Sequence, residues 1–301
     1  MSTNSAPDRS LTAAGLIVTY ALIIGFTDNF VRVIAVDAGL WQFHATRSAM
    51  ALGLLGIAGL VMGFGLRPKN ARAVFARSFI HGAGIMIYFG ALAFLPVALV
   101  AAGLFTAPIF VLLINRFAFE QKVGFVQVLA VLIGFAGVVL VLGPEAMSGA
   151  SFAALLPILA GFLYALGNIA TRRWCADESA VTLLAGFFGA LGVCGLLGMV
   201  VLIGHAAPLG SDGFIERGAV WASGTFYFWT FVQAAGSLIG VGFMIRAYQI
   251  THVSRAAVLE YVILPASAFW SYMIWGQTLG LIAIAGMVLI AVAGMIISLS
   301  R

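Results

Sequence analysis

The chain has 301 residues, of which 63% are hydrophobic and only 8% are charged, and its mean hydropathy is +1.12. Soluble domains carry about 25% charged residues to cover their surface, so this composition excludes a soluble globular protein and predicts one that is solvated by lipid. The net charge of +5 would favour a nucleic-acid ligand in a soluble chain. Here the positions of the basic residues provide a different explanation.

Ten stretches of the chain are apolar and long enough to cross a bilayer, which takes about 20 residues per helix. We expect them near Leu11–Ala35, Trp41–Gly65, Ser78–Leu95, Val97–Phe117, Phe125–Leu142, Phe152–Thr171, Ala180–Gly204, Val220–Ile245, Ala256–Trp275 and Leu279–Leu299. The first stretch is too long for the core of a signal peptide. The sequence therefore predicts an all-α integral membrane protein with ten transmembrane helices.

Basic residues gather in the even-numbered connections between these stretches. Those connections hold Arg67, Lys69, Arg72, Arg77, Arg116, Lys122, Arg172, Arg173, Arg246 and Arg255. The odd-numbered connections hold Arg217 alone among basic residues. Because short cytoplasmic loops are enriched in Lys and Arg, we expect both termini in the cytoplasm and the protein in the inner membrane of a bacterial cell.

An internal repeat is visible when the chain is shifted on itself by 157 residues. Pro108 then falls on Pro265, and Val131–Ile133 falls on Val288–Ile290. The alternative is chance agreement between residues that are common in membranes. Five helices in each half would insert the halves in opposite orientations, and inverted repeats of this kind typify secondary transporters.

The repeat divides the chain into two units, 1–147 and 148–301. Pro108 and Pro265 would occupy equivalent helices and kink them, either for transport or for packing alone.

Several short motifs support the same division. The segments Asp28–Arg32 and Gly167–Arg172 end the first helix of each half, His44–Arg47 begins the second helix, and Ala247–Ala257 joins the eighth and ninth. In order and spacing the chain resembles the drug/metabolite transporter superfamily, and each half resembles an EamA-type five-helix module. The resemblance covers nearly the whole chain. It implies a carrier of small molecules that needs no cofactor.

The family often has Gly-Glu before the closing helix of each module, and this chain departs from that pattern. It has Phe119-Glu120 in the first half and Gly276-Gln277 in the second. Within the superfamily the chain resembles the YddG-type exporters of aromatic and other neutral amino acids. This similarity implies the export direction, which the residues alone do not.

Charged residues within the spans need a reason, because a charge at the bilayer centre costs about 2.5–3.5 kcal/mol on insertion scales. Asp28, Asn29, Arg32 and Arg47 lie toward the outer ends of the first two spans. We predict a contact from Asp28 to Arg47 or Arg32, which either fixes helix packing or forms an outer gate or polar network. Since Arg32 and Arg47 are the only cations expected in the spans, strongly anionic sugar phosphates are disfavoured as substrates.

A second polar group is expected nearer the cytoplasmic side, where Glu260, His81 and Asn168 lie inside their spans. Glu260 could bind a substrate ammonium or a proton, or it could be a structural acid. A cavity for an amphipathic solute also needs aromatic faces and a few polar groups. Candidates at mid-depth are Tyr88, Phe105, Tyr164, Gln233 and Trp270. Residues near span ends, expected at the membrane interface, are Trp41, Trp174, Trp221, Trp275 and Tyr248.

The motifs HExxH, GxSxG and GxxxxGK[ST] are absent from the sequence, so zinc proteases, serine hydrolases and ATP-driven pumps lose their simplest support. An intramembrane enzyme using His81 and Glu260, and a membrane scaffold or receptor, are the alternatives from other classes. The leading prediction is an alternating-access carrier. Its expected partners are an amino acid or another small metabolite such as a nucleoside, sugar or drug-like solute, and the bilayer, with protons and a second copy of the chain as further candidates.

Overall fold

The computed structural model describes residues 9–91, 95, 97–142, 153, 155–204, 213–278 and 280–299, which are helical with short connections and contain no strand. The helices are α1 (Ser10–Asp28), α2 (Val31–Asp37), α3 (Leu40–Met62), α4 (Ala71–Ala91), α5 (Val97–Leu104), α6 (Ala107–Phe117), α7 (Phe125–Leu142), α8 (Leu155–Arg173), α9 (Ala180–Val201), α10 (Gly224–Ile250), α11 (Val253–Leu259), the 3₁₀ turn η4 (Glu260–Val262), α12 (Ile263–Trp275) and α13 (Leu281–Leu299). The chain ends and the predicted boundary between 147 and 148 lie outside the described residues.

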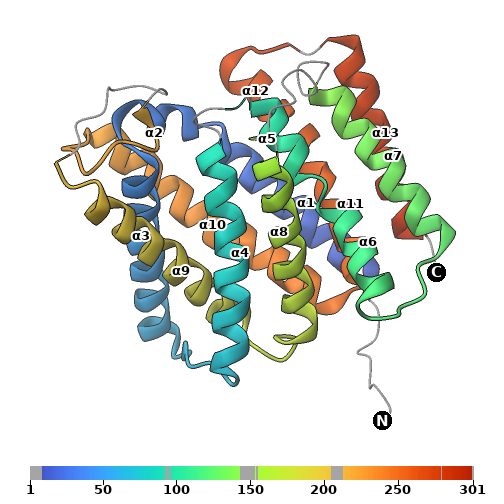
Figure 1. Ribbon diagram of the computed structural model, residues 1–301, viewed down its shortest axis with the longest axis horizontal. Coiled ribbons are helices and arrows are strands. Elements are labelled where there is room, and N and C mark those ends of the chain that lie inside the picture. The colour runs from blue at the N-terminus through green and yellow to red at the C-terminus, as the bar shows by residue number, and fades with distance from the viewer. Residues whose placement is uncertain are drawn as a thin grey trace.

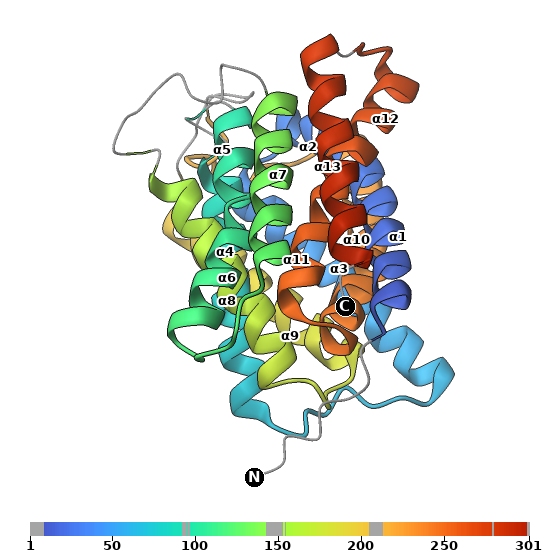
Figure 2. The same cartoon turned by 90° about the vertical axis from the view of Figure 1, so that its right-hand side faces the viewer.

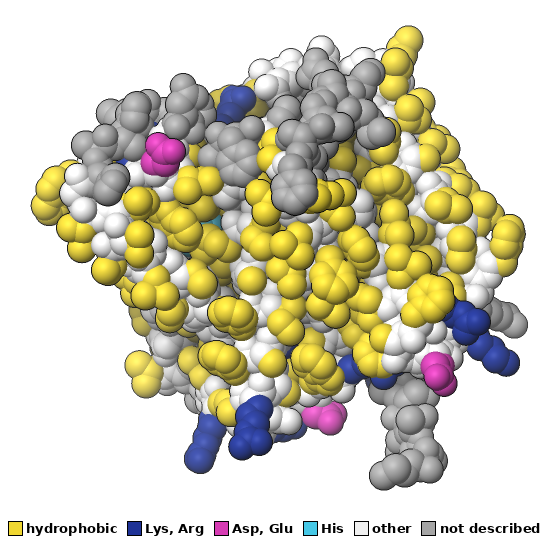
Figure 3. All heavy atoms as spheres, viewed as in Figure 1, with side chains coloured by type: hydrophobic (Ala, Val, Ile, Leu, Met, Phe, Trp, Pro, Cys, Tyr) yellow, Lys and Arg dark blue, Asp and Glu magenta, His cyan; other side chains and the backbone are white. Residues whose placement is uncertain are grey.

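Nine helices of the described chain, counting continuous pairs together, are long and apolar enough to cross a membrane. They coincide with the first nine predicted spans. The tenth predicted span coincides with α13, whose apolar part, Leu281–Ile297, is shorter. Apolar side chains cover the middle of the face in Figure 3, and basic side chains gather mainly along its lower edge. The chain is therefore a multi-pass membrane protein.

Two of the spans are interrupted just before a proline. The fourth predicted span divides into α5 and α6 at Phe105 and Thr106, ahead of Pro108, and the ninth passes through η4 ahead of Pro265. Proline has no backbone N–H and its ring crowds the carbonyl four residues earlier. The irregular turns include or adjoin the residues four positions before each proline, so both predicted proline positions coincide with a distorted helix.

The helices pack through small residues, as is usual in membranes. The most extensive contact joins α7 and α13, which lie side by side in Figures 1 and 2. A Cβ atom on Gly137 would lie 2.7 Å from the carbonyl oxygen of Gly286, and one on Gly286 would lie 2.6 Å from that of Gly137. The two backbones approach so closely that neither position has room for a side chain. Other extensive contacts join α3 to α9, α1 to α10 and α4 to α8.

Two arginines that the charge pattern assigned to loops are instead fully buried. Arg77 lies within α4, because this helix begins at Ala71 rather than near Ser78. Arg217 is buried in the connection before α10 and donates hydrogen bonds to the carbonyls of Ala35 and Val36. Arg77 therefore adds a buried cation that the sequence analysis did not count.

Candidate functional site

A cavity of about 510 Å³ lies among the helices of the bundle. It runs from Ala257 and Glu260 at its inner end to Val31, Ala35 and Phe214 at its outer end. Most of its wall is apolar or aromatic, and a few polar side chains converge on it. A pocket with apolar walls and few polar groups is typical of small-molecule sites.

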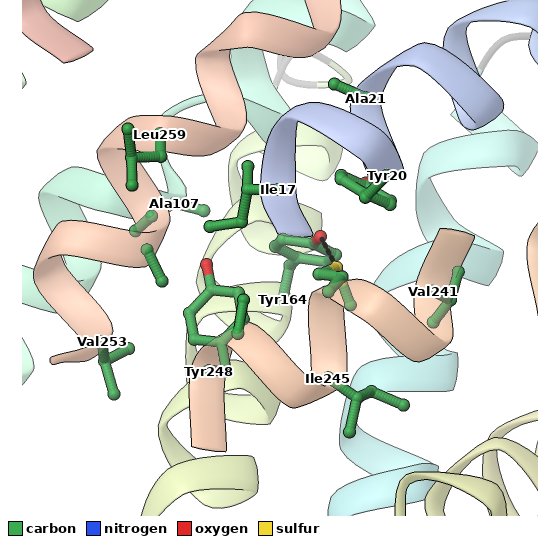
Figure 4. Packing of buried hydrophobic residues seen from close by; sticks show 14 of the residues in the cluster. Ile17, Tyr20, Ala21, Ala107, Tyr164, Val241, Ile245, Tyr248, Val253 and Leu259 are labelled. Atoms are coloured by element: carbon green, nitrogen blue, oxygen red, sulfur yellow. Dashed lines mark hydrogen bonds between the residues drawn. The ribbon is translucent and has the colours of Figure 1, made fainter. Parts of the chain in front are cut away.

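The inner end of the cavity is organised around the carboxylate of Glu260, which the break at η4 places there. The hydroxyl of Tyr164 in α8 donates a hydrogen bond to Oε1 of Glu260 at 2.9 Å. The hydroxyl of Tyr248 in α10 donates to Oε2, also at 2.9 Å. Both tyrosines belong to the packed core in Figure 4, where the dashed line marks the contact of Tyr164 with the sulfur of Met244 at 3.1 Å. Three helices are thus joined at one buried acid.

His81 forms the adjacent part of the inner end. Its ring centroid lies 4.6 Å from that of Tyr164 and 5.3 Å from that of Phe187. A Cβ atom on Gly167 would lie 2.6 Å from Nδ1 of His81, so the glycine makes room for the imidazole. The side chain is buried and Nδ1 has no hydrogen-bond partner. His81 and Glu260 both line the inner end of the cavity, and each contacts Tyr164.

A relay of side chains crosses the outer half of the cavity. Nε2 of Gln233 donates to Oδ1 of Asp28 at 2.7 Å. The hydroxyl of Ser237 donates to Oε1 of Gln233 and accepts from Nη2 of Arg47, both at 2.8 Å. Asp28 and Arg47 are thus connected through two residues of α10 rather than by the direct contact that the sequence predicted. The relay ties α1 to α3 through α10.

Arg32 and Asn29, the other two residues of the predicted gate, face different neighbours. The guanidinium of Arg32 lies 3.6 Å from the ring centroid of Trp275, and the side chain is exposed at the outer end of the cavity. The amide of Asn29 donates to the carbonyls of Gly25 and Ser267, at 2.7 and 3.2 Å, and does not line the cavity. Asn29 therefore holds α1 against α12, where Arg32 remains available to the cavity.

Tyr88, Phe105 and Pro108 line the wall between the two ends. Phe105 lies in the break between α5 and α6, and its carbonyl accepts a hydrogen bond from the hydroxyl of Tyr261 at 3.1 Å. Tyr261 belongs to η4, so this bond joins the two interrupted spans across the bundle.

Four other predicted residues do not line the cavity. Asn168 is buried in α8, where its amide lies against the hydroxyl of Tyr248. Gln233 acts through the relay. Trp270 packs on Phe26, with centroids 5.1 Å apart, and donates to the carbonyl of Leu22. Pro265 contributes through the shape of its helix alone.

Sequence reasoning missed several contributors to the site. Tyr248 was expected at the membrane interface, but it is fully buried and bonded to Glu260. Tyr20 and Ile24 line the cavity on the same face of α1 as Asp28, and their spacing of four residues was the signal that could have found them. Ser237 likewise follows Gln233 by one helical turn. In the described chain, no cluster of His, Cys, Asp and Glu could hold a metal ion.

Comparisons with known proteins agree with this architecture. Residues 11–143 match the EamA-like transporter family. The chain is 24% identical over 290 residues to the pseudopaline exporter CntI of Pseudomonas aeruginosa, covering 94% of this chain and 95% of that protein. It is 25% identical over 185 residues to the riboflavin transporter of Vibrio cholerae, covering 60% and 62%. A solved crystal structure shares the fold, with a TM-score of 0.73, 20% identity, and 95% of this chain and 97% of that chain covered.

Proposed function

We propose that this chain, which belongs to the EamA type of the drug/metabolite transporter superfamily, is an alternating-access carrier that exports neutral, preferably aromatic, amino acids across a membrane. The relatives are transporters rather than enzymes. Export accords with the similarity to the pseudopaline exporter CntI.

The proposed topology has ten spans in two inverted halves, 1–147 and 148–301, with both termini cytoplasmic in a bacterial inner membrane. Support comes from the paired interruptions before Pro108 and Pro265. Further support comes from the basic side chains that gather near one edge of the bundle. In this orientation the end with Val31 and Phe214 is periplasmic, and the cavity lies toward the outside.

The observation that carries the substrate proposal is the division of the cavity into polar ends and an apolar wall. Glu260 offers a carboxylate at the inner end, and Arg47 and Arg32 offer guanidinium groups toward the outer end. Tyr88 and Phe105 lie along the wall. An α-amino acid carries its ammonium and its carboxylate on one carbon, so it can engage one charged end of the cavity at a time while its apolar side chain lies along the wall.

Glu260 is proposed to bind the substrate ammonium, or a proton when the substrate is absent, so that protons could be the coupling ion. Its two oxygens already accept bonds from Tyr164 and Tyr248. A carboxylate has about four lone-pair sites, so capacity remains for a third donor. The tyrosines hold the acid in place while a ligand or proton exchanges.

The test is uptake and counterflow of labelled phenylalanine, leucine and N-acetylphenylalanine in proteoliposomes, with and without a pH gradient. Wild-type protein should move phenylalanine saturably and N-acetylphenylalanine poorly, because acetylation removes the ammonium charge. Glu260→Gln should lose at least about tenfold in transport, as expected for one charged contact. Glu216→Gln, at an exposed acid outside the cavity, is the matched control. Wild-type rates for Glu260→Gln at every pH would rule out this role.

Riboflavin belongs in the same panel, because one relative is named as its transporter. Saturable riboflavin movement without any amino-acid movement would keep the carrier and replace the substrate.

A further inference from the structure

Arg77 is one of the largest fully buried side chains of the protein. It lies in α4 and reaches toward α8 and the start of α9. Its Nε donates to the hydroxyl of Thr171 at 2.9 Å, and its Nη1 donates to the carbonyl of Leu183 at 3.4 Å. Both acceptors are uncharged, so these bonds position the guanidinium without neutralising it.

The third nitrogen, Nη2, has no hydrogen-bond partner. Within the described chain no carboxylate forms an ion pair with Arg77. A buried charge is normally paired, because its transfer out of water costs several kcal/mol. Nη2 of Arg77 is therefore a buried, charged donor that points to an anionic acceptor as its partner.

The position of Arg77 relative to the cavity suggests which anion. Arg77 and His81 are four residues apart on α4, so they share one helical face about 6 Å apart along the axis. They face Thr171 and Gly167, which are also four residues apart on α8. His81 lines the inner end of the cavity. Arg77 therefore lies one helical turn beyond it, toward the proposed cytoplasmic side.

Other buried polar atoms without partners lie on the same two helices. The clearest of them is Nδ1 of His81 on α4, because the amide of Asn168 on α8 lies against the hydroxyl of Tyr248. Buried polar groups in native proteins are nearly always paired with protein or with an unseen water or ligand. The layer of α4 next to the inner end of the cavity therefore holds two buried nitrogens, Nη2 of Arg77 and Nδ1 of His81, that have no hydrogen-bond partner in this conformation.

We propose that Arg77 is a second substrate-binding residue, which binds the carboxylate of the substrate when the carrier opens toward the cytoplasm. The inference rests on the proposed function. Loading from the cytoplasm would place the substrate carboxylate on Nη2 of Arg77 and its ammonium near Glu260. In the present conformation Arg77 does not line the cavity, whereas His81 and Tyr164 do. Among the described arginines only Arg47 and Arg32 line it. The two cation positions would thus serve opposite states of one transport cycle.

The test measures half-saturation from each face, in inside-out and right-side-out membrane vesicles, for phenylalanine and for phenylalaninamide, which has no carboxylate. Arg77→Gln should raise the half-saturating phenylalanine concentration at the cytoplasmic face by about tenfold or more. The periplasmic value should change less than about twofold, which is under 0.5 kcal/mol. The value for phenylalaninamide should be insensitive to the substitution. Arg172→Gln, which removes a cation from the same end of α8 outside the cavity, should behave like wild type.

Equal affinities for phenylalanine in wild type and Arg77→Gln at both faces would overturn the inference. If Arg77→Gln does not fold, Arg77→Lys replaces it. Lysine keeps the charge but not the planar donors, so the cytoplasmic affinity should still fall. Wild-type affinity in Arg77→Lys, with Arg77→Gln unfolded, would assign Arg77 to the fold alone.

A readout independent of transport separates this inference from the proposed function. The probe is 3-phenylpropionate, a carboxylate without an ammonium, added to purified protein during thermal unfolding. Because Arg47 and Arg32 also reach the cavity, the probe should raise the melting temperature of all three proteins, but by less in Arg77→Gln than in wild type and Arg172→Gln. The same shift in all three, or no shift in wild type, would refute the anion site at Arg77. Absence of phenylalanine transport together with the expected shifts would refute only the amino-acid proposal.

Discussion

The hydroxyl of Tyr248 donates to Oε2 of Glu260 at 2.9 Å, across 12 positions of the chain and across the break between α10 and α11. This bond closes the turn at Thr251 and His252 from inside the bundle. The same carboxylate is held from α8 by Tyr164. The carboxylate of Glu260 therefore links α8 to the turn between α10 and α11.

Substitution of Tyr248 by Phe is expected to loosen this coupling. A hydrogen bond to a carboxylate contributes about 1.5–3 kcal/mol, so thermal unfolding in detergent should show a loss of that order. Transport should slow, because Glu260 is held by one hydroxyl instead of two. Tyr227→Phe, at an exposed ring of α10, is the matched control. If Tyr248→Phe unfolded and transported like the control, the bond would have no role in either property.

The relay from Asp28 to Arg47 predicts energetic coupling between residues that do not touch. Gln233→Leu removes the donor to Asp28 and the acceptor for Ser237. Transport rates of Asp28→Asn, Arg47→Gln and Gln233→Leu, alone, in pairs and all three together, form double-mutant cycles. We expect a coupling of about 0.5–3 kcal/mol between Asp28 and Arg47 that vanishes in the Gln233→Leu background. Additive effects in the parent background would show that the relay carries no interaction.

The sequence could predict the membrane class, nine of the spans, and the depth of most cavity residues, because hydrophobic length and helical rise are local properties. Five of the eight predicted substrate-binding residues line the cavity: His81, Tyr88, Phe105, Tyr164 and Glu260. It could not predict which way a helix faces. Trp270 has the right depth but turns toward Leu22, and Tyr248 has the depth of an interfacial residue but turns inward.

The assignment of basic residues to loops was wrong for Arg77 for a related reason. The sequence places Arg77 in a connection because other basic residues surround it. Its burial depends on Thr171 and Leu183, which are far along the chain. Long-range partners of this kind leave no periodic signal in a single sequence.

The glycine contact between α7 and α13 predicts a sharp difference between two Gly→Ala substitutions. At Gly137 a methyl group would meet the backbone of Gly286 at 2.7 Å, and such overpacking costs about 1–3 kcal/mol. At Gly53, in α3, a methyl group meets nothing within 4 Å. There alanine should stabilise by up to about 1 kcal/mol through helix propensity. Melting temperatures in one detergent compare the two directly, and a lower value for Gly53→Ala than for Gly137→Ala would contradict the packing described.

The thiol of Cys175, in the connection between α8 and α9, predicts a pH dependence outside the spans. Burial raises the pKa of this thiol from its ordinary value of 9.0 to about 11. The nearby Arg77 partly opposes this rise, and Glu178 adds to it. Alkylation requires the thiolate. Folded Cys194→Ala protein should therefore react with iodoacetamide far more slowly at pH 8 than the same protein unfolded in detergent, and it should react appreciably only as the pH approaches 11. Because the folded pKa is the higher one, the neutral thiol favours the fold below pH 9, and this contribution is lost as the pH rises through about 11. Equal alkylation rates for folded and unfolded protein at pH 8 would show that Cys175 is open to water, and would contradict the packing of Gln249 against the carbonyl of Cys175 at 2.9 Å.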